Sequence, residues 1–186
     1  MDRAARIVRM ESRLIVRDVR EDMREIEGLA TAGVLDRVGD IIEPRGVRVK
    51  KTPSPLLWQH DHAKPVGTAS LMAPTKDGVR FKAKLPLVKN PGLLQDRVNE
   101  AWDSIKAGII KGVSIGFRPV PGKVEAIVNG GMRFLEVEVF ELSLVTVPAM
   151  PLAEIDVVRG VRVVKLADPG RGRVVMLNKP LRHKNA

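Results

Sequence analysis

Two histidines stand two positions apart in LLWQHDHAKPVG, residues 56–67, and the chain has one other histidine, His183. Imidazole can bind a metal, act as a base near neutral pH, or serve only as a packed or solvated side chain. A zinc site at His60 and His62 would need carboxylates to complete it, because the chain has no cysteine. We therefore expect no metal and no cofactor. A plain structural pair and a general base both remain open, and a base requires a nucleophile elsewhere in the chain.

The candidate nucleophile is a serine in GVSIGF, residues 112–117. In a strand, alternation would direct Val113, Ile115 and Phe117 to the core and Ser114 to the other face. The glycines on either side would leave the hydroxyl accessible and would let a substrate backbone approach. The segment has the letters of a G-x-S-x-G elbow, but no strand-to-helix turn follows it. Ser114 is thus a candidate only if the fold brings a base to it.

Composition limits the classes of protein to consider. The chain has 186 residues, of which 44% are hydrophobic, which suits one domain with a real core. No apolar run approaches the length that spans a bilayer, and the N-terminal residues lack the apolar core of a signal peptide. These features predict a cytoplasmic protein.

The net charge of +10 has two possible meanings. It favours a polyanionic partner, either nucleic acid or an acidic protein surface, or else it reflects a solvated basic surface. Aromatic residues make up only 3%, too few for a base-stacking platform.

Alternation with period two dominates the chain. GVRFKAKLP is the clearest strand, with apolar residues on one face and cations on the other. We expect about eight or nine short strands, which include RLIVRDV, REIEGLAT, RGVRVK, PLLWQH, KGVSIGF, KVEAIV, MRFLEVEVF and ELSLVTVP. The glycines of NGG, residues 129–131, predict a turn between two of them. A three-and-four apolar spacing predicts one amphipathic helix over about 91–107, with Gly108 at its C-terminal end.

Many strands and one long helix predict a mainly β (α+β) fold. We expect an antiparallel barrel or sandwich, with the long helix and shorter helices at its periphery. Residues 1–166 would form this domain. Residues 167–186 are basic and rich in Gly and Pro, and we expect them to form a flexible tail.

Three blocks of this sequence resemble the signature blocks of the tailed-phage prohead proteases, whose fold is similar to that of herpesvirus assemblin. The blocks are LLWQHDHAKPVG, KAGIIKGVSIGF and FELSLVTVPAMPLAEI, and the earlier GLATAGVLDRVGDIIEPRGV also matches. The resemblance spans about residues 24–155. It implies a serine endopeptidase in which His60 and Ser114 are the catalytic pair, with His62 as a bystander.

The resemblance also implies a third catalytic member that orients the histidine, a role that a second histidine fills in assemblin-like enzymes. This chain offers carboxylates in FLEVEVFELSLV instead. Glu141 stands at the acidic position of the family's E-x-S-L-V block, so we expect the role to fall to it, with Glu138 second. Glu136 shares a strand face with Glu138 and is the third candidate. The competing interpretation is a solvated edge of carboxylates that balances basic neighbours.

The resemblance implies a maturation protease that cuts the scaffold-like segment of the major capsid protein, and also itself, inside the procapsid in the bacterial cytoplasm. Its partners would be the capsid protein and further copies of this chain, with no specific nucleic acid and no membrane. Two alternatives remain open. A catalytically inactive assembly or scaffolding module would keep the fold without cleaving anything. A basic nucleic-acid-binding β-barrel would bind DNA in a salt-dependent way that does not need Ser114.

Overall fold

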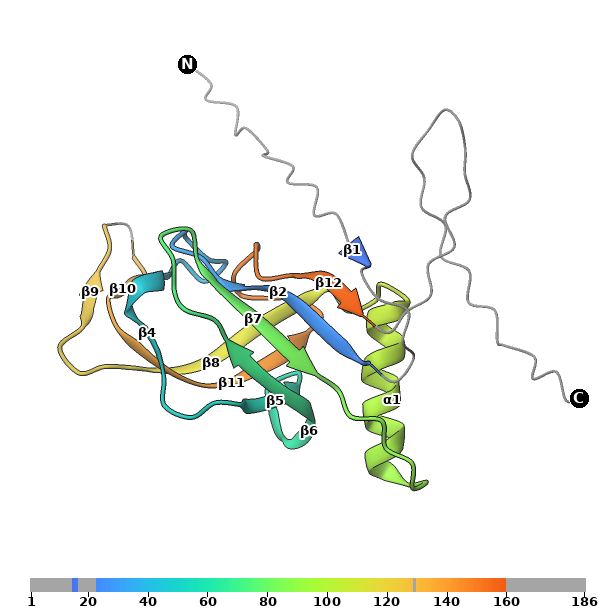
Figure 1. The fold of residues 1–186 in the computed structure, drawn as a ribbon. Coiled ribbons are helices and arrows are strands. Elements are labelled where there is room, and N and C mark those ends of the chain that lie inside the picture. The colour runs from blue at the N-terminus through green and yellow to red at the C-terminus, as the bar shows by residue number, and fades with distance from the viewer. Residues whose placement is uncertain (1–14, 17–22, 129, 160–186) are drawn as a thin grey trace, which may run out of the picture.

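The computed structural model of this chain describes residues 15–16, 23–128 and 130–159 (Figure 1). The expected tail, residues 167–186, and most of the RLIVRDV segment lie outside these ranges, as does His183.

Most strands belong to one large mixed sheet. Its order is β1-β12-β2-β7-β6-β5-β11-β4. Strands β4 and β5 pair with successive stretches of β11, and β8 pairs with β11 along its whole length. The pairs β1–β12, β11–β4 and β11–β5 are parallel, and the remaining pairs are antiparallel. The strands are β1 (Ile15–Val16), β2 (Glu25–Thr31), β4 (Val47–Val49), β5 (Ser54–Trp58), β6 (Asp61–Leu71), β7 (Val79–Lys84), β8 (Gly112–Pro119), β11 (Val137–Val145) and β12 (Ile155–Arg159).

A smaller sheet of three strands has the order β3-β10-β9. It consists of β3 (Ile41–Ile42), β9 (Val124–Ala126) and β10 (Met132–Phe134). The antiparallel pair β9–β10 is joined through the predicted NGG turn, in which Gly130 and Gly131 both have positive φ. In Figure 1 this small sheet lies at one end of the molecule and the helix α1 at the other.

The mainly β, α+β class is confirmed, but the architecture differs from the expected one. The large sheet is mixed and not purely antiparallel, and it does not close into a barrel. Alternation in a sequence fixes which face of a strand is buried but not which strand it pairs with, so parallel pairing was not predictable. In the described ranges the one α-helix is accompanied only by a 3-10 turn, Pro44–Gly46, in place of the expected peripheral helices.

One buried apolar cluster forms the core, and it joins residues from the large sheet, β3 and α1. Strand β7 alternates strictly between buried and exposed residues, as GVRFKAKLP predicts. The helix α1 (Leu93–Lys106) buries four residues, Val98, Ala101, Trp102 and Ile105, whereas Leu94 near its start is half exposed. The helix ends where predicted, because Gly108 adopts a left-handed φ of 71° and its N–H donates to the carbonyl of Ile105.

Two strand boundaries differ from the sequence expectation. We expected one strand in MRFLEVEVF and another in ELSLVTVP, with a break between the two segments. The break instead lies inside MRFLEVEVF, because β10 ends at Phe134 and β11 runs without interruption from Val137 to Val145. The long strand β6 was missed, since its exposure does not alternate and it contains Pro65. The pairing of β6 with β5 shifts register on both sides of Leu57, the residue that pairs with Pro65. Proline is tolerated in a sheet at such an irregularity.

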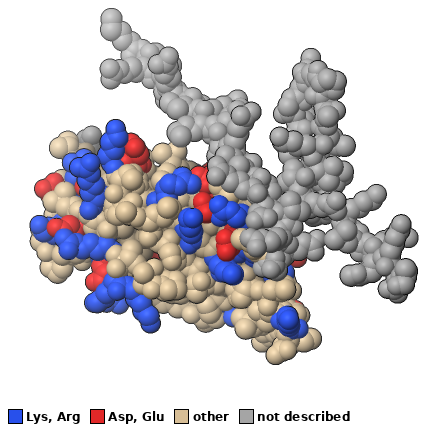
Figure 2. Space-filling view, in the orientation of Figure 1, with Lys and Arg blue, Asp and Glu red and all other residues tan. Residues whose placement is uncertain are grey.

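Lys and Arg side chains are spread over the face shown in Figure 2, several of them beside Asp or Glu. The ion pairs of the described residues include Arg48 with Glu136 and Arg80 with Asp156, each 2.6 Å apart. None of the helices in the described ranges has the length and apolar character needed to cross a membrane.

Candidate active site

His60 lies in the two-residue turn that joins β5 to β6. Trp58 pairs with Asp61, so Gln59 and His60 form the tip, and both have positive φ, 53° and 59°. Positive φ at both tip residues is the geometry of a type I′ hairpin, which normally uses Asn and Gly. In this turn the conformation is supported by β11, because the Gln59 N–H donates to the Leu144 carbonyl at 2.9 Å. The turn therefore presents the imidazole above β11.

The His60 imidazole contacts a buried carboxylate on β11. Nδ1 lies 2.7 Å from Glu141 Oε1, and Glu141 is only 2% exposed whereas the His60 side chain is 43% exposed. A carboxylate can only accept, so Nδ1 carries the proton and Nε2 is left as a lone-pair base. The hydrogen bond that His60 donates to Glu141 raises the pKa of His60 above its ordinary value, against the opposing effect of partial burial.

A bulge in β11 determines the face on which Glu141 lies. Val139 pairs with Phe117 and Glu141 with Gly116, so Phe140 is an extra residue without a partner on β8. Uninterrupted alternation would place Glu141 on the face opposite to Glu138. The bulge resets the phase, and it carries Glu141 and Ser143 to the face that Ser114 and Gly116 share on β8.

Ser114 lies on β8 directly opposite Ser143 of β11. Its neighbours Val113 and Ile115 are buried, as predicted, while Ser114 itself is half-buried. The Ser114 hydroxyl makes no hydrogen bond within the part of the chain that the structure describes. The unpaired hydroxyl thus lies on β8, the strand next to the one that carries Glu141.

The two glycines of GVSIGF make room for neighbouring residues. A Cβ at Gly116 would overlap Glu141 Oε1 and would lie 2.7 Å from its Cγ. A Cβ at Gly112 would lie 2.7 Å from Pro148 Cδ. The absence of a side chain at Gly116 is thus what allows the Glu141 side chain to lie over this part of β8. From the sequence we expected these glycines to leave the Ser114 hydroxyl accessible, which is a different role.

The other candidate residues lie away from this contact. His62 is exposed, with its ring edge-on to Phe140 at 6.2 Å between centroids. Glu138 pairs with Lys50 at 3.3 Å. Glu136 pairs with Arg48, and also with a second cation, Lys123. Of the three carboxylates considered, Glu141 is the one in contact with a histidine.

Sequence reasoning missed the buried hydroxyl of Ser143. Ser143 Oγ donates to Glu141 Oε2 at 2.8 Å and accepts from the His60 backbone N–H at 3.1 Å. The i, i+2 spacing of Glu141 and Ser143 was a visible signal, since residues two apart in a strand share a face.

A small pocket of about 40 Å³ adjoins Ser114. Its walls are mostly apolar and come from distant segments, among them Ile42, Ile115, Phe117 and Met150. Thr31 also lines it, and the Thr31 hydroxyl is fully buried without a hydrogen-bond partner among the described residues. Ala149 at its rim is exposed.

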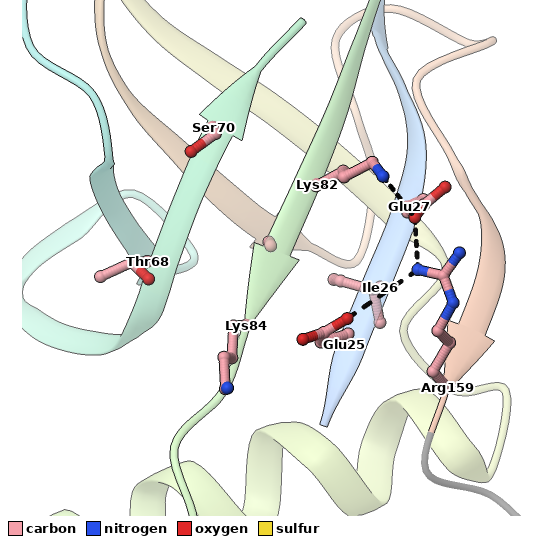
Figure 3. Close-up of a pocket in the computed structure, with 9 residues that line it drawn as sticks. Glu25, Ile26, Glu27, Thr68, Ser70, Lys82, Lys84 and Arg159 are labelled. Atoms are coloured by element: carbon pink, nitrogen blue, oxygen red, sulfur yellow. Dashed lines mark hydrogen bonds and ion pairs between the residues drawn. The ribbon is translucent and has the colours of Figure 1, made fainter. Parts of the chain in front are cut away.

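A second pocket, of about 190 Å³, lies on the large sheet across β2, β7 and β6 (Figure 3). Its acidic and basic side chains largely neutralise each other. Glu27 contacts both Lys82 and Arg159, and Arg159 also reaches Glu25. In the described ranges, no group of three or more His, Asp or Glu side chains is arranged to hold a metal ion.

The sequence of the chain is similar to those of known phage proteins. Residues 30–166 match the sequence profile of the Caudovirus prohead serine protease. The chain is 40% identical over 158 residues to the capsid polyprotein of Pseudomonas phage PAJU2. The aligned region covers 82% of this chain and 23% of that protein. It is 26% identical over 136 residues to the prohead protease of Escherichia phage T5, covering 69% of this chain and 60% of that protein. The chain thus spans less than two thirds of either curated relative.

Proposed function

Because this chain belongs to the Caudovirus prohead serine protease family, we propose that it is a serine endopeptidase that acts during maturation of a phage prohead. The observation that carries the proposal is the 2.7 Å contact of His60 Nδ1 with the buried Glu141, next to a strand on which Ser114 is free. A serine hydroxyl becomes a good nucleophile only when a neighbouring base takes its proton.

The reaction would proceed by acyl transfer. Ser114 Oγ attacks the peptide carbonyl carbon while its proton passes to His60 Nε2. The tetrahedral intermediate collapses, the C–N bond breaks, and the leaving amine takes that proton from His60. Water then attacks the acyl-enzyme with His60 again as the base, which releases the new carboxyl end and restores Ser114. Glu141 holds the imidazole in the reactive tautomer and stabilises its protonated form.

The pocket beside Ser114 is proposed to receive a substrate side chain next to the scissile bond. A volume of about 40 Å³ accommodates one or two water-sized groups, which corresponds to a small side chain. We expect a small residue at this position of the substrate.

The substrate is proposed to be the scaffold-like segment of the major capsid protein, with self-cleavage as a second reaction. The family match and the similarity to a protein named capsid polyprotein support this assignment. The protein would then act inside the procapsid, in the cytoplasm of the bacterial host, in contact with the capsid protein and with other copies of itself.

Labelling by a fluorophosphonate tests the active site without knowledge of the substrate. This probe reacts covalently with an activated serine oxygen, and intact mass reports the product. We expect one label, on Ser114, in the wild-type chain, and none in the Ser114→Ala and His60→Ala variants. The double variant should be no worse than either single one, because such residues act as a unit. His62→Ala should label nearly as fast as the wild type. Labelling that survives His60→Ala would contradict the proposed base.

Co-expression with the capsid protein of the same phage tests the substrate. Intact mass should show a shortened capsid protein with the wild-type chain and a full-length one with Ser114→Ala. Processing by the Ser114→Ala chain would sink the proposal. A metal chelator should change nothing, and inhibition reversed by added zinc would instead indicate a metal site.

A pair of substitutions tests the pocket. Ala149→Phe fills its rim, so it should reduce capsid cleavage strongly while a small fluorophosphonate still labels Ser114. Ala126→Phe places the same ring on an exposed site of β9 and is the matched control. If both variants process capsid protein at the same rate, this pocket does not bind the substrate.

A further inference from the structure

Ser143 is a fully buried serine at the centre of the candidate site. Its hydroxyl has one donor and can accept, and both capacities are used. It donates to Glu141 Oε2 at 2.8 Å and accepts from the His60 N–H at 3.1 Å. With no exposed surface, Ser143 cannot itself meet a substrate.

The two oxygens of the Glu141 carboxylate have different partners. Oε1 accepts from His60 Nδ1, and Oε2 accepts from Ser143 Oγ. A carboxylate with a donor on each oxygen cannot rotate about its terminal torsion without breaking one of the two bonds. The Ser143 bond therefore keeps Oε1 pointed at the imidazole.

The same hydroxyl also holds the backbone that carries the imidazole. Left-handed φ angles at two consecutive non-glycine residues are unfavourable, by roughly 1–2 kcal/mol each, and need support from the surroundings. Gln59 is held by hydrogen bonds: its backbone N–H donates to the Leu144 carbonyl in β11, and its side-chain amide donates to the hydroxyl of Thr146, which follows β11. On the His60 half, the backbone N–H bonds to Ser143.

We propose that Ser143 is a positioning residue that sets the distance and angle between His60 and Glu141 by binding to both. This inference rests on the proposed function, since the geometry that Ser143 sets is that of the proposed base. The role is separate from stabilising the fold, because the hydroxyl links the backbone of one member to the side chain of the other.

The test compares three substitutions with a matched control. Ser143→Ala removes both hydrogen bonds, Ser143→Cys keeps the volume but offers only a weak donor, and Ser143→Thr keeps the hydroxyl. Ser54→Ala is the control, because Ser54 is also a buried serine whose hydroxyl is hydrogen-bonded, in its case to the Lys51 carbonyl. The rate of fluorophosphonate labelling and the low-field proton resonance of His60 Nδ1–H are both measured.

We expect Ser143→Ala and Ser143→Cys to slow labelling by about 10- to 100-fold and to shift or broaden the His60 resonance. Ser143→Thr should recover most of the rate and the resonance. Ser54→Ala should leave both unchanged, even if it lowers the unfolding midpoint. Ser143→Cys preserves packing, so it decides the question if Ser143→Ala does not fold.

Wild-type labelling and an unchanged resonance in a folded Ser143→Ala or Ser143→Cys chain would overturn the positioning role. That result is distinct from failure of the proposed function, in which wild-type and Ser114→Ala chains would behave alike.

Discussion

At the scale of single residues, the candidate site depends on an exposed histidine that contacts a buried carboxylate. Glu141 is 2% exposed, and its carboxylate is stabilised by hydrogen bonds from two donors, His60 Nδ1 and Ser143 Oγ. Buried charge without such donors is strongly destabilising. A substitution at Glu141 that keeps the size of the side chain and removes its charge can therefore test the role of the charge alone.

Glu141→Gln keeps the size of the side chain but removes the charge that stabilises the protonated imidazole. We expect the rate of Ser114 labelling to fall by about 10³- to 10⁴-fold, with the fold intact, as in other triads whose carboxylate becomes an amide. Glu138→Gln is the control, since Glu138 contacts Lys50 and not His60. A wild-type rate in Glu141→Gln would show that the carboxylate is not part of the machinery.

The raised pKa of His60 predicts a pH dependence. The reactive form has a neutral imidazole, so the rate should rise with pH through a pKa above 6.5, and Glu141→Gln should move this limb to lower pH. The contribution of the pair to stability has the opposite sense. It is fully present below about pH 6.5 and is lost as pH rises through the raised pKa.

NMR titration of the His60 ring protons in the Ser114→Ala chain measures this pKa directly. His62→Gln in the same chain removes the neighbouring signal. A His60 that titrates at or below 6.5 would be inconsistent with the Glu141 contact.

At the scale of elements, the site depends on how β8 and β11 fit together. Glu141 crosses β8 at Gly116, where only a hydrogen atom leaves enough space. The Phe140 bulge puts Glu141 on that face in the first place. The two irregularities, a bulge on one strand and a glycine on the other, are complementary.

Gly116→Ala should therefore be harmful through one specific contact. Its methyl group would overlap Glu141, and such overpacking typically lowers the free energy of unfolding by about 1–3 kcal/mol. We expect slower labelling as well, since Glu141 must move. Urea unfolding measures the first effect.

A double-mutant cycle identifies the cause. In a Glu141→Ala chain, which lacks the overlapping atoms, Gly116→Ala should cost much less stability than in the wild type. Additive effects of the two changes would mean that some other neighbour of Gly116 is responsible.

At the scale of the whole molecule, the net charge of +10 and the site are separate properties. Many basic side chains are spread over the face shown in Figure 2. Several basic residues form ion pairs with acidic ones, such as Arg48 with Glu136 and Arg80 with Asp156. Excess positive charge attracts polyanions without specificity, and salt screens that attraction. Binding to nucleic acid is therefore expected as a general electrostatic effect.

We expect weak association with duplex DNA at low ionic strength, equal for wild-type and Ser114→Ala chains, and loss of most of it by about 0.2 M salt. Fluorescence anisotropy of a labelled duplex measures it. Tight binding that persists at that salt would favour the nucleic-acid-binding alternative over the peptidase.

The sequence by itself determined the local features of this protein. Alternation identified β7 and the buried face of β8, and the three-and-four spacing identified α1 and its end at Gly108. His60, Ser114 and Glu141 were chosen through the resemblance of their sequence blocks to those of the prohead proteases. These properties depend on neighbours in the chain, so the order of residues is enough to specify them.

Only the tertiary structure decided what those residues contact. His60, Ser114 and Glu141 come from a turn and two strands that are far apart in the chain, and strand pairing alone brings them together. The bulge at Phe140, the left-handed turn at His60 and the parallel pairing of β5 with β11 leave no periodic signal, because each is set by the fit between distant backbones. For the same reason the sequence analysis missed Ser143, whose hydroxyl acquires its partners only when β11 lies beneath the β5–β6 turn.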